Sequence, residues 1–151
     1  MSVRIAVLLA LAVVLGSAAN AVSPRGLSWS HPLGQGLRAS ILEAGLHPVD
    51  LRQLSDLMRE DRVRLLDARP AGEYKIGHLA GAQSHPWRDI EEGKAPLPPA
   101  AGPTVVYCSN EFCDDALRLG RLLVRRGDRD VGVLVDGYDG WWNRKWPVEQ
   151  D

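Results

Sequence analysis

Two cysteines five positions apart are the residues of this chain best suited to do chemistry. Cys108 ends an apolar, β-branched run at 105–107, and a short polar segment separates it from Cys113 and the start of a helical pattern. A cysteine between a buried strand and a helix faces the first N–H groups of that helix, which favour negative charge and lower the pKa of a thiol. The pattern therefore indicates a nucleophilic thiolate at Cys108, although a buried and inert cysteine also fits it.

Cys113 adds a second chemistry, because two thiols at this spacing can form a disulfide. In an oxidising compartment, Cys113 could resolve a persulfide or a sulfenate on Cys108 and so make a redox device. A permanent bridge and an inert, buried Cys113 are the alternatives, and the sequence leaves all of these open.

The elements that must position the cysteines follow from apolar periodicity. Helices are predicted over 51–60, 87–92 and 114–126 and after Gly137, and strands over 63–67, 104–107 and 131–135. Asp50 and Gln53 form a plausible capping box for the first helix, and Gly127 ends the third. Strands that alternate with helices predict an α/β fold, with a parallel sheet covered by helices on both faces.

The amino-terminal segment predicts export. An unbroken apolar run over 5–15 is followed by small residues at 19–21, the order of a secretory signal. We expect 1–21 to be a signal peptide cleaved after Ala21, or an anchor that tethers the chain to a membrane through residues 4–22. The domain would then be periplasmic or secreted, or anchored to the inner membrane. Proline and glycine indicate a linker over 22–45, which leaves 46–149 as the folded domain.

Composition narrows the class of protein. A length of 151 residues suits one domain, and the net charge of −1 offers no field that would attract nucleic acid. Two cysteines cannot form a disulfide-rich scaffold, and the histidines show no spacing typical of a metal site, so we expect no metal and no cofactor.

Three segments, in order, resemble the signatures of the rhodanese-like family. They are the stretch LDARPAGEY at 66–74 with GHLAGA at 77–82, the junction of strand and cysteine at 105–108, and VLVDGYDGW at 133–141 with WPV at 146–148. The resemblance covers roughly residues 46–149. It implies a rhodanese-like fold, in which a five-stranded parallel sheet is flanked by helices on both faces.

The resemblance also implies an activity and a site. Cys108 would accept a sulfane sulfur from a small donor, hold it as a persulfide and pass it to a thiol or a cyanide-like acceptor. The loop that would bind the substrate consists of Ser109, Asn110, Glu111, Phe112, Cys113 and Asp114. Residues that would support the fold rather than the reaction are Asp67, Arg69, Glu73, His78, Gly81, Gly137 and Trp141.

The loop departs from the family pattern, because it has neither glycine nor arginine. Its backbone N–H groups could still cradle a persulfide. The acidic residues Glu111, Asp114 and Asp115 disfavour a thiolate and repel anionic donors such as thiosulfate, although Asp114 and Asp115 also suit the first turn of a helix. An acidic loop is poorly suited to phosphatase chemistry. Two other functions stay open: a non-catalytic interaction module with this fold, and a thiol–disulfide redox protein that uses Cys108 and Cys113.

Overall fold

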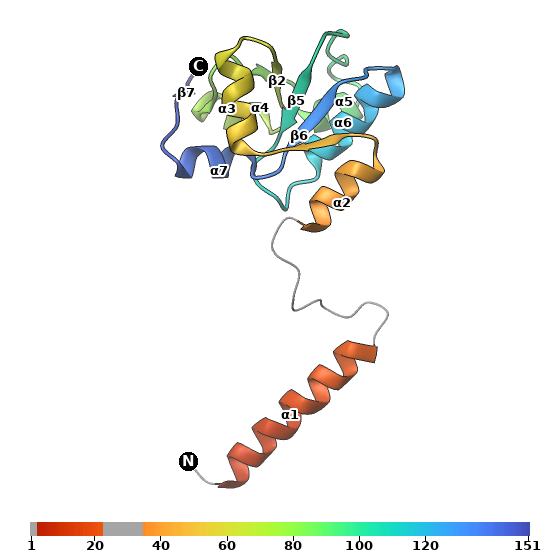
Figure 1. Cartoon of the computed structure of the whole chain (residues 1–151), viewed down its shortest axis with the longest axis vertical. Helices are drawn as coiled ribbons and strands as arrows, with labels where there is room; N and C mark the ends of the chain where they lie inside the picture. Colours follow the sequence, from red (N-terminus) through yellow and green to blue (C-terminus); the bar gives the residue numbers. More distant parts are fainter. Residues whose placement is uncertain (1–2, 23–34) are drawn as a thin grey trace. The chain divides into compact units, whose positions relative to one another are not determined.

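The computed structural model describes residues 3–22 and 35–151, which belong to two separate units (Figure 1). The first unit contains a single helix, α1 (Val3–Val22). Several large apolar side chains of α1 are exposed, among them Leu8, Val13 and Leu15. Among the described residues, no helix combines the length and the apolar character that a membrane span requires. All other elements belong to the second unit, which is the folded domain.

The predicted linker over 22–45 is wrong in its last third. Residues there form the helix α2 (Gln35–Glu43), and its Ile41 is completely buried in the domain core. Leu37 packs against the same core, one turn earlier on the same face of the helix. Glycine and proline before and within this segment obscured the short apolar period. The domain therefore begins at or before Gln35, and residues 23–34 lie outside the described residues.

The central sheet confirms the predicted fold class. Its five strands are β1 (His47–Val49), β2 (Arg64–Asp67), β4 (Gln83–Ser84), β5 (Thr104–Tyr107) and β6 (Val131–Leu134). They lie in the order β1-β6-β5-β2-β4, and every pair is parallel. β5 is therefore the middle strand. β1 and β4 were not predicted, because two or three residues are too few to show a period.

The described part of the domain has five further helices, and the four that the sequence analysis predicts agree closely in range. The five are α3 (Leu51–Arg59), α4 (Ala71–Ile76), α5 (Trp87–Glu91), α6 (Asp115–Arg126) and α7 (Gly137–Asn143). Asp50 and Gln53 form the expected capping box, and Gly127 ends α6 in the left-handed conformation. The structure adds a small antiparallel sheet of β3 (His78–Leu79) and β7 (Val148–Glu149), which the sequence analysis missed.

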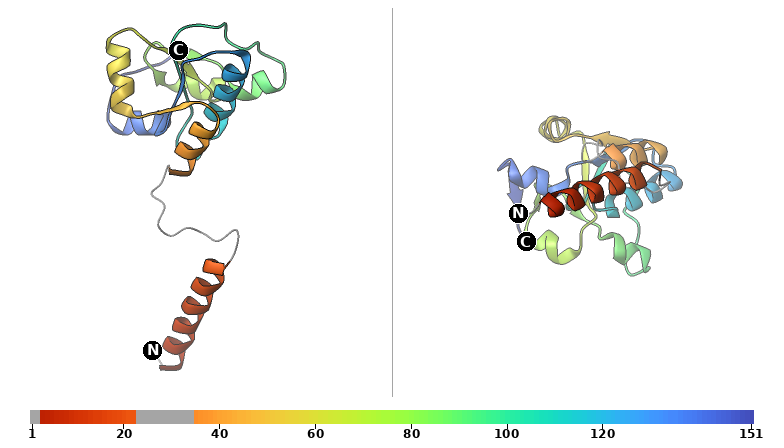
Figure 2. Two further views of the ribbon diagram at one scale, coloured as in Figure 1. Left: turned by 45° about the vertical axis from the view of Figure 1, so that its right-hand side comes forward. Right: turned by 90° about the horizontal axis from the view of Figure 1, so that it is seen from below.

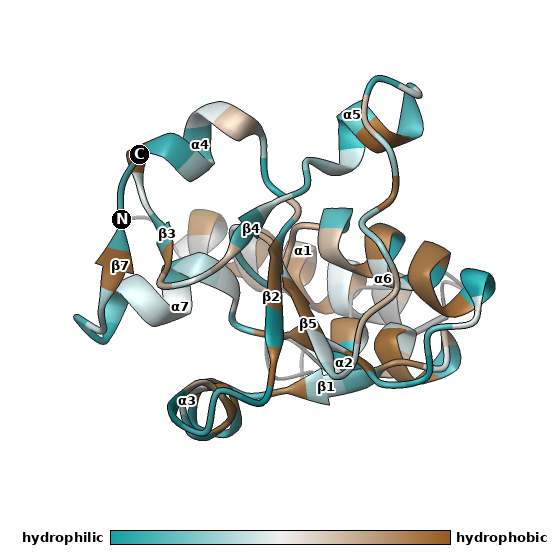
Figure 3. Ribbon diagram, turned by 90° about the horizontal axis from the view of Figure 1, so that it is seen from above, coloured by the Kyte–Doolittle hydropathy of each residue, from teal (hydrophilic) through white to brown (hydrophobic). Residues whose placement is uncertain are grey.

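Two cores separate the sheet from its helices, one on each face (Figure 2). Residues of α2, α5 and α6 contribute to one core, and residues of α3 and α7 contribute to the other. Figure 3 shows hydrophobic segments in β2 and β5 and also in the neighbouring helix α6. Alternate residues of β5 serve opposite cores: Val106 and Cys108 pack toward α6, whereas Val105 and Tyr107 pack toward α7. The alternation places the Cys108 side chain on the α6 face.

A buried ion pair fixes the end of β2. Asp67 and Arg69 are 0% and 3% exposed, and the Arg69 Nη2 and Nε atoms donate to the Asp67 carboxylate at 2.5 and 3.0 Å. Arg69 also donates to the Gly77 carbonyl at 2.8 Å, and its guanidinium lies 4.0 Å from the centre of the Tyr138 ring. Burial is the largest single influence on the pKa of Arg69 and lowers it, but the hydrogen bonds and charge of Asp67, with smaller contributions that include Glu73, together raise it. The pair joins α4, β2 and α7.

Gly137 lets α7 approach the segment after β5. Its φ is +60°, and a Cβ there would lie 2.7 Å from the carbonyl oxygens of both Cys108 and Ser109. The next two residues use this closeness: Tyr138 N donates to the Cys108 carbonyl and Asp139 N to the Ser109 carbonyl, each at 2.8 Å. The start of α7 thereby holds the backbone that carries Cys108.

We expect Gly137→Ala to lower the free energy of unfolding by roughly 2 to 4 kcal/mol, because the substitution combines a left-handed residue with overlap against backbone. Chemical denaturation of the folded chain measures this loss. Gly72→Ala is the matched control, because a Cβ at this α4 position meets no atom within 4 Å. The control should be neutral or stabilising by up to about 1 kcal/mol. Equal stabilities of the two variants would show that α7 does not depend on this close approach.

Candidate functional site

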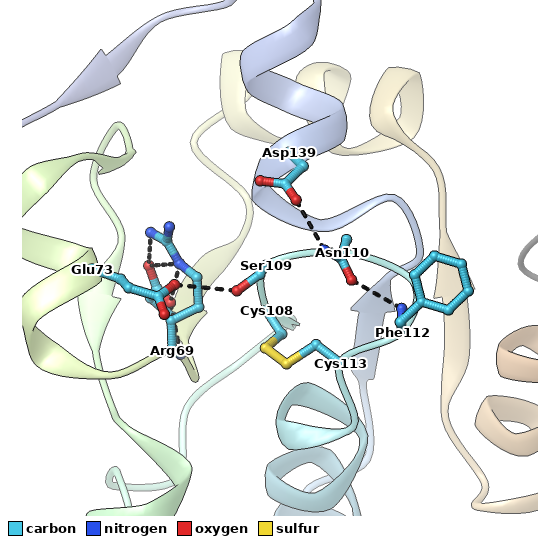
Figure 4. The surroundings of a disulfide bond; sticks show 9 residues. Arg69, Glu73, Cys108, Ser109, Asn110, Phe112, Cys113 and Asp139 are labelled. Atoms are coloured by element: carbon cyan, nitrogen blue, oxygen red, sulfur yellow. Dashed lines mark hydrogen bonds and ion pairs between the residues drawn. A yellow bond between two sulfur atoms is a disulfide. The ribbon is translucent and has the colours of Figure 1, made fainter.

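The two cysteines of the chain form a disulfide at the carboxyl end of β5 (Figure 4). Their Cα atoms are 6.1 Å apart, within the normal range for a disulfide. Cys108 is only 2% exposed, whereas Cys113 is partly exposed. Among the states that the sequence left open, the structure therefore has the bridged one, with Cys113 on the solvent side of Cys108.

The position of Cys108 follows from the strand. β5 pairs with β2 on one side and β6 on the other, so its last residues lie at the centre of the carboxyl edge of the sheet. Ligands and reacting groups of open α/β sheets lie at this edge, where loops leave the strands. Cys108 continues the alternation of β5 and belongs to the same core as Ala116 and Leu117 in the first turns of α6.

Hydrogen bonds hold the cysteine loop (residues 108–113) from two sides, as Figure 4 shows. On one side, Ser109 Oγ donates to Glu73 Oε2 of α4 at 3.2 Å. On the other, Asn110 Nδ2 donates to Asp139 Oδ2 of α7 at 3.0 Å. The loop is thus a fixed bridge between α4 and α7, which favours a sulfur held at a defined place.

Part of the expected backbone cradle is already in use. Phe112 N donates to the Asn110 side chain and Cys113 N to the Asn110 carbonyl, both at 3.1 Å. These two N–H groups are therefore not available to a bound anion. Asn110 thereby sets the turn of the loop, a role typical of asparagine, whose side chain bonds its own backbone two residues on.

The structure separates the predicted substrate-binding residues. Ser109, Asn110 and Cys113 surround Cys108 through the contacts above. Phe112 is 74% exposed, and its ring points away from the disulfide (Figure 4). Glu111 is partly exposed and Asp114 is exposed. Asp114 also lacks a side-chain cap bond to α6, although its carbonyl accepts from Arg118 N.

Asp115 lies beside the sulfur atoms of the disulfide, whereas the sequence predicts for it only an effect of its negative charge. Its carboxylate and the two Sγ atoms all lie within 4.8 Å of one another. Burial raises the pKa of Asp115, while Arg88 and Arg118 act in the opposite direction. In the part of the chain that the structure describes, these three residues are the one group with the ligand atoms for a metal ion, and a disulfide lacks the thiolates that such an ion would need.

Sequence reasoning also missed other residues at this site. Glu73 was assigned to fold support, yet its carboxylate meets the loop. Asp139 lies within the third family signature, but the sequence analysis predicts no role for it at the site. A signal for it was present: residues that follow β6 lie beside residues that follow β5, because parallel neighbours end at the same edge. Arg88 could not be found this way, since it lies on α5, twenty residues before Cys108.

The remaining signature residues lie in the supporting structure. His78 is buried and stacks on Tyr74, with ring centres 3.8 Å apart. Gly81 has a φ of +73° and donates its N–H to Glu149 Oε2 at 2.9 Å. Trp141 Nε1 donates to the Pro147 carbonyl at 2.9 Å. The bonds of Gly81 and Trp141 hold the closing segment of the chain, which contains Pro147 and Glu149, against the β3 region and α7.

Comparisons with known proteins agree with this architecture. Among curated proteins, the chain is 31% identical over 109 residues to the HTH-type transcriptional regulator Rv0324 of Mycobacterium tuberculosis (strain ATCC 25618 / H37Rv). The match covers 68% of this chain and 46% of the regulator, so the chain spans about half the length of that relative.

Two solved structures show the same fold. The BH2092 protein from Bacillus halodurans superposes with a TM-score of 0.61 at 22% identity, over 77% of this chain and 85% of that one. The human single-domain sulfurtransferase TSTD1 gives a TM-score of 0.55 at 22% identity, over 64% of this chain and 96% of that one.

A comparison with protein-family models matches residues 50–144 to the Rhodanese-like domain. The match runs from the cap of α3 to the end of α7 and includes the cysteine loop, Gly137 and every strand of the central sheet except β1. Because it covers more than half of the chain, the protein belongs to the rhodanese-like domain family.

Proposed function

We propose that this protein is a rhodanese-type sulfurtransferase that carries sulfane sulfur as a persulfide on Cys108. The observation that carries the proposal is the place of Cys108 on the middle strand, between a loop tethered on both sides and the first turn of α6. The human protein TSTD1, whose structure has the same fold, is described as a sulfurtransferase, and this supports the same chemistry.

The proposed reaction has two steps. The Cys108 thiolate attacks the outer sulfur of a sulfane donor, so a new S–S bond forms and the rest of the donor leaves with the electron pair of the broken bond. A thiol or cyanide-like acceptor then takes the outer sulfur and returns Cys108 to a thiolate. The helix α6 helps because its first N–H groups favour negative charge on the sulfur.

The disulfide sets a condition on this reaction. In the bridged form, Cys108 is buried and its sulfur is bonded to Cys113, so it is not available as a thiolate. A thiol or dithiol reductant must therefore open the bridge before sulfur is accepted. The oxidised chain is the closed form of the site, and the reduced chain is the competent one.

The disulfide itself favours a second candidate, in which Cys113 resolves the persulfide. The Cys113 thiolate would attack the inner sulfur of the Cys108 persulfide, form the observed bridge and release hydrogen sulfide. The two thiols are oxidised by two electrons, and the sulfane sulfur is reduced to sulfide. The protein would then act as a thiol–disulfide redox protein. A non-catalytic interaction module is the third candidate, and a thiol that never accepts sulfur would indicate it.

We expect reduced Cys113→Ser to gain the mass of one sulfur atom from thiosulfate or inorganic polysulfide, because its Cys108 is free and cannot be resolved. Intact-mass spectrometry before and after treatment with a reductant measures the gain. Cys108→Ser should gain nothing while it remains folded. Oxidised wild-type protein should gain nothing until it is reduced.

The reduced wild-type chain separates the two candidates. Persistent sulfur on Cys108 supports transfer, whereas return to the disulfide mass with one sulfide released per chain supports resolution by Cys113. If Cys108→Ser transfers sulfur as well as the parent does, the sulfurtransferase proposal is wrong. If Cys108 stays a thiol under every condition, the interaction module is favoured.

We also propose that the domain works outside the cytoplasm, because the apolar run at 5–15 precedes small residues at 19–21. The cysteine bridge agrees with an oxidising compartment. A reporter that is active only after export should give a signal when it is fused behind the full chain. Amino-terminal sequencing that begins at Val22 would establish cleavage, and an intact amino terminus in the membrane fraction would establish an anchor. A full-length chain found only in the soluble cytosol contradicts both forms of the proposal.

A further inference from the structure

A cleft with charges of both signs lies next to the disulfide. It consists of two cavities of about 280 and 320 Å³ that share Arg88 and Asp115, and we call it the Arg88 cleft. Ala68, Pro70 and Pro86 give the first cavity apolar walls beside Asp89. The second cavity is lined mainly by charged side chains, including Asp114 and Arg118.

Asp115 connects the cleft to the reactive sulfurs. It lines both cavities, and its carboxylate lies within 4.8 Å of the Sγ atoms of Cys108 and Cys113. Of the two cysteines, Cys113 is the partly exposed one. Neither cavity is lined by a cysteine, so Asp115 is the link between the cleft and the disulfide, and Cys113 is the more exposed sulfur beside that link.

The charges of the cleft suit a ligand that carries both signs. Arg88 is a cation that lines both cavities with Asp115. Its charge acts to lower the pKa of Asp115, although burial has the larger effect and raises it overall. Asp89 and Asp115 are carboxylates in the same cavity. In that cavity a dianion would meet Arg88 and two carboxylates. The second cavity adds Arg118, but also the carboxylates of Glu91, Glu92 and Asp114. An ammonium group and a carboxylate on one small molecule would each find an opposite charge.

We propose that the Arg88 cleft binds a small zwitterionic thiol of the amino-acid type, such as cysteine, and aims its sulfur at Cys113. Arg88 would hold the carboxylate of this thiol, Asp115 and Asp89 its ammonium group, and Pro70 and Pro86 its carbon chain. The inference extends the proposed function by naming the class of thiol that the site takes. It is tested on the disulfide alone, so its failure and the failure of sulfur transfer are distinguishable.

The chemistry is thiol–disulfide exchange in two steps. The thiolate of the ligand attacks Cys113 Sγ, a mixed disulfide forms, and Cys108 leaves with the electron pair of the broken bond. A second thiol molecule attacks the ligand sulfur of the mixed disulfide and releases Cys113 as a thiol. Two thiols are oxidised to one small disulfide, and the protein disulfide is reduced to two thiols.

The test measures the rate of opening of the Cys108–Cys113 bridge in the oxidised full chain by three thiols. L-cysteine carries both charges, cysteamine lacks the carboxylate and N-acetylcysteine lacks the ammonium group. Each rate is divided by the rate of the same thiol with a small reference disulfide, which removes differences in intrinsic reactivity. Alkylation of released thiols followed by mass spectrometry gives the rates. We expect the normalised rate of cysteine to exceed the other two by roughly two- to fivefold, the range for exposed ion pairs.

Variants assign the preference to residues. Arg88→Gln should remove the advantage of cysteine over cysteamine and leave its advantage over N-acetylcysteine. Asp115→Asn should reduce the advantage over N-acetylcysteine, while Asp89 keeps part of it. Arg121→Gln is the matched control, because this exposed arginine of α6 lines neither cavity and should change no ratio.

Three results would overturn the inference. One is equal normalised rates for the three thiols, and another is an unchanged order in Arg88→Gln. The third is a bridge that none of the three thiols opens. Thermal melting of each variant shows whether it is folded, and Arg88→Lys, which keeps the charge, should restore part of the preference in a folded chain.

Discussion

The contact between the start of α7 and the backbone after β5 is the constraint on which the site depends. Gly137 brings two N–H groups of α7 onto the carbonyls of Cys108 and Ser109 at 2.8 Å. The guanidinium of Arg69 stacks on the ring of Tyr138, the residue that bonds the Cys108 carbonyl, and is itself fixed by buried Asp67. One continuous set of contacts thus joins the ends of β2, β5 and β6, and the three sequence signatures of the family are its parts.

The cysteine pair can be oxidised or reduced, and its oxidation state decides whether Cys108 is accessible. Cys113 covers Cys108 in the bridged form, so the nucleophile of the proposed reaction is protected until a reductant opens the bridge. The acidic surroundings disfavour dianionic donors, whereas the Arg88 cleft offers an opposite charge to each end of a zwitterion. The same charges would thus weaken the binding of dianionic donors and favour the zwitterionic thiol that we propose.

Much of the fold could be predicted from sequence because long apolar runs carry a clear period. β5, β6, α3 and α6 were found this way, and the alternation of strands and helices gave the parallel sheet. β1 and β4 were missed because they are only three and two residues long. α2 was missed because glycine and proline outweighed the spacing of Leu37 and Ile41.

Site residues that are contiguous in the sequence could be predicted, whereas site residues from other elements could not. Cys108 and its loop are contiguous, and so they were found together. Glu73, Asp139 and Arg88 come from three other elements, and only the fold brings them to the cysteines. Whether Cys108 and Cys113 are bridged also depends on the distance between them in the folded chain, which spacing in sequence does not determine.

The central claim is that Cys108, once released from Cys113, has a lowered pKa and therefore a larger thiolate fraction at neutral pH than an ordinary thiol. The pH dependence of the alkylation rate of Cys108 in Cys113→Ser tests it most directly, because this variant has a single thiol. The first turn of α6 favours the anion and the nearby carboxylates oppose it, and the account requires the helix to prevail. It predicts a pKa below the ordinary thiol value of about 8.5. A pKa at or above that value would show that the carboxylates prevail, and Cys108 would then not be the activated nucleophile of a sulfurtransferase.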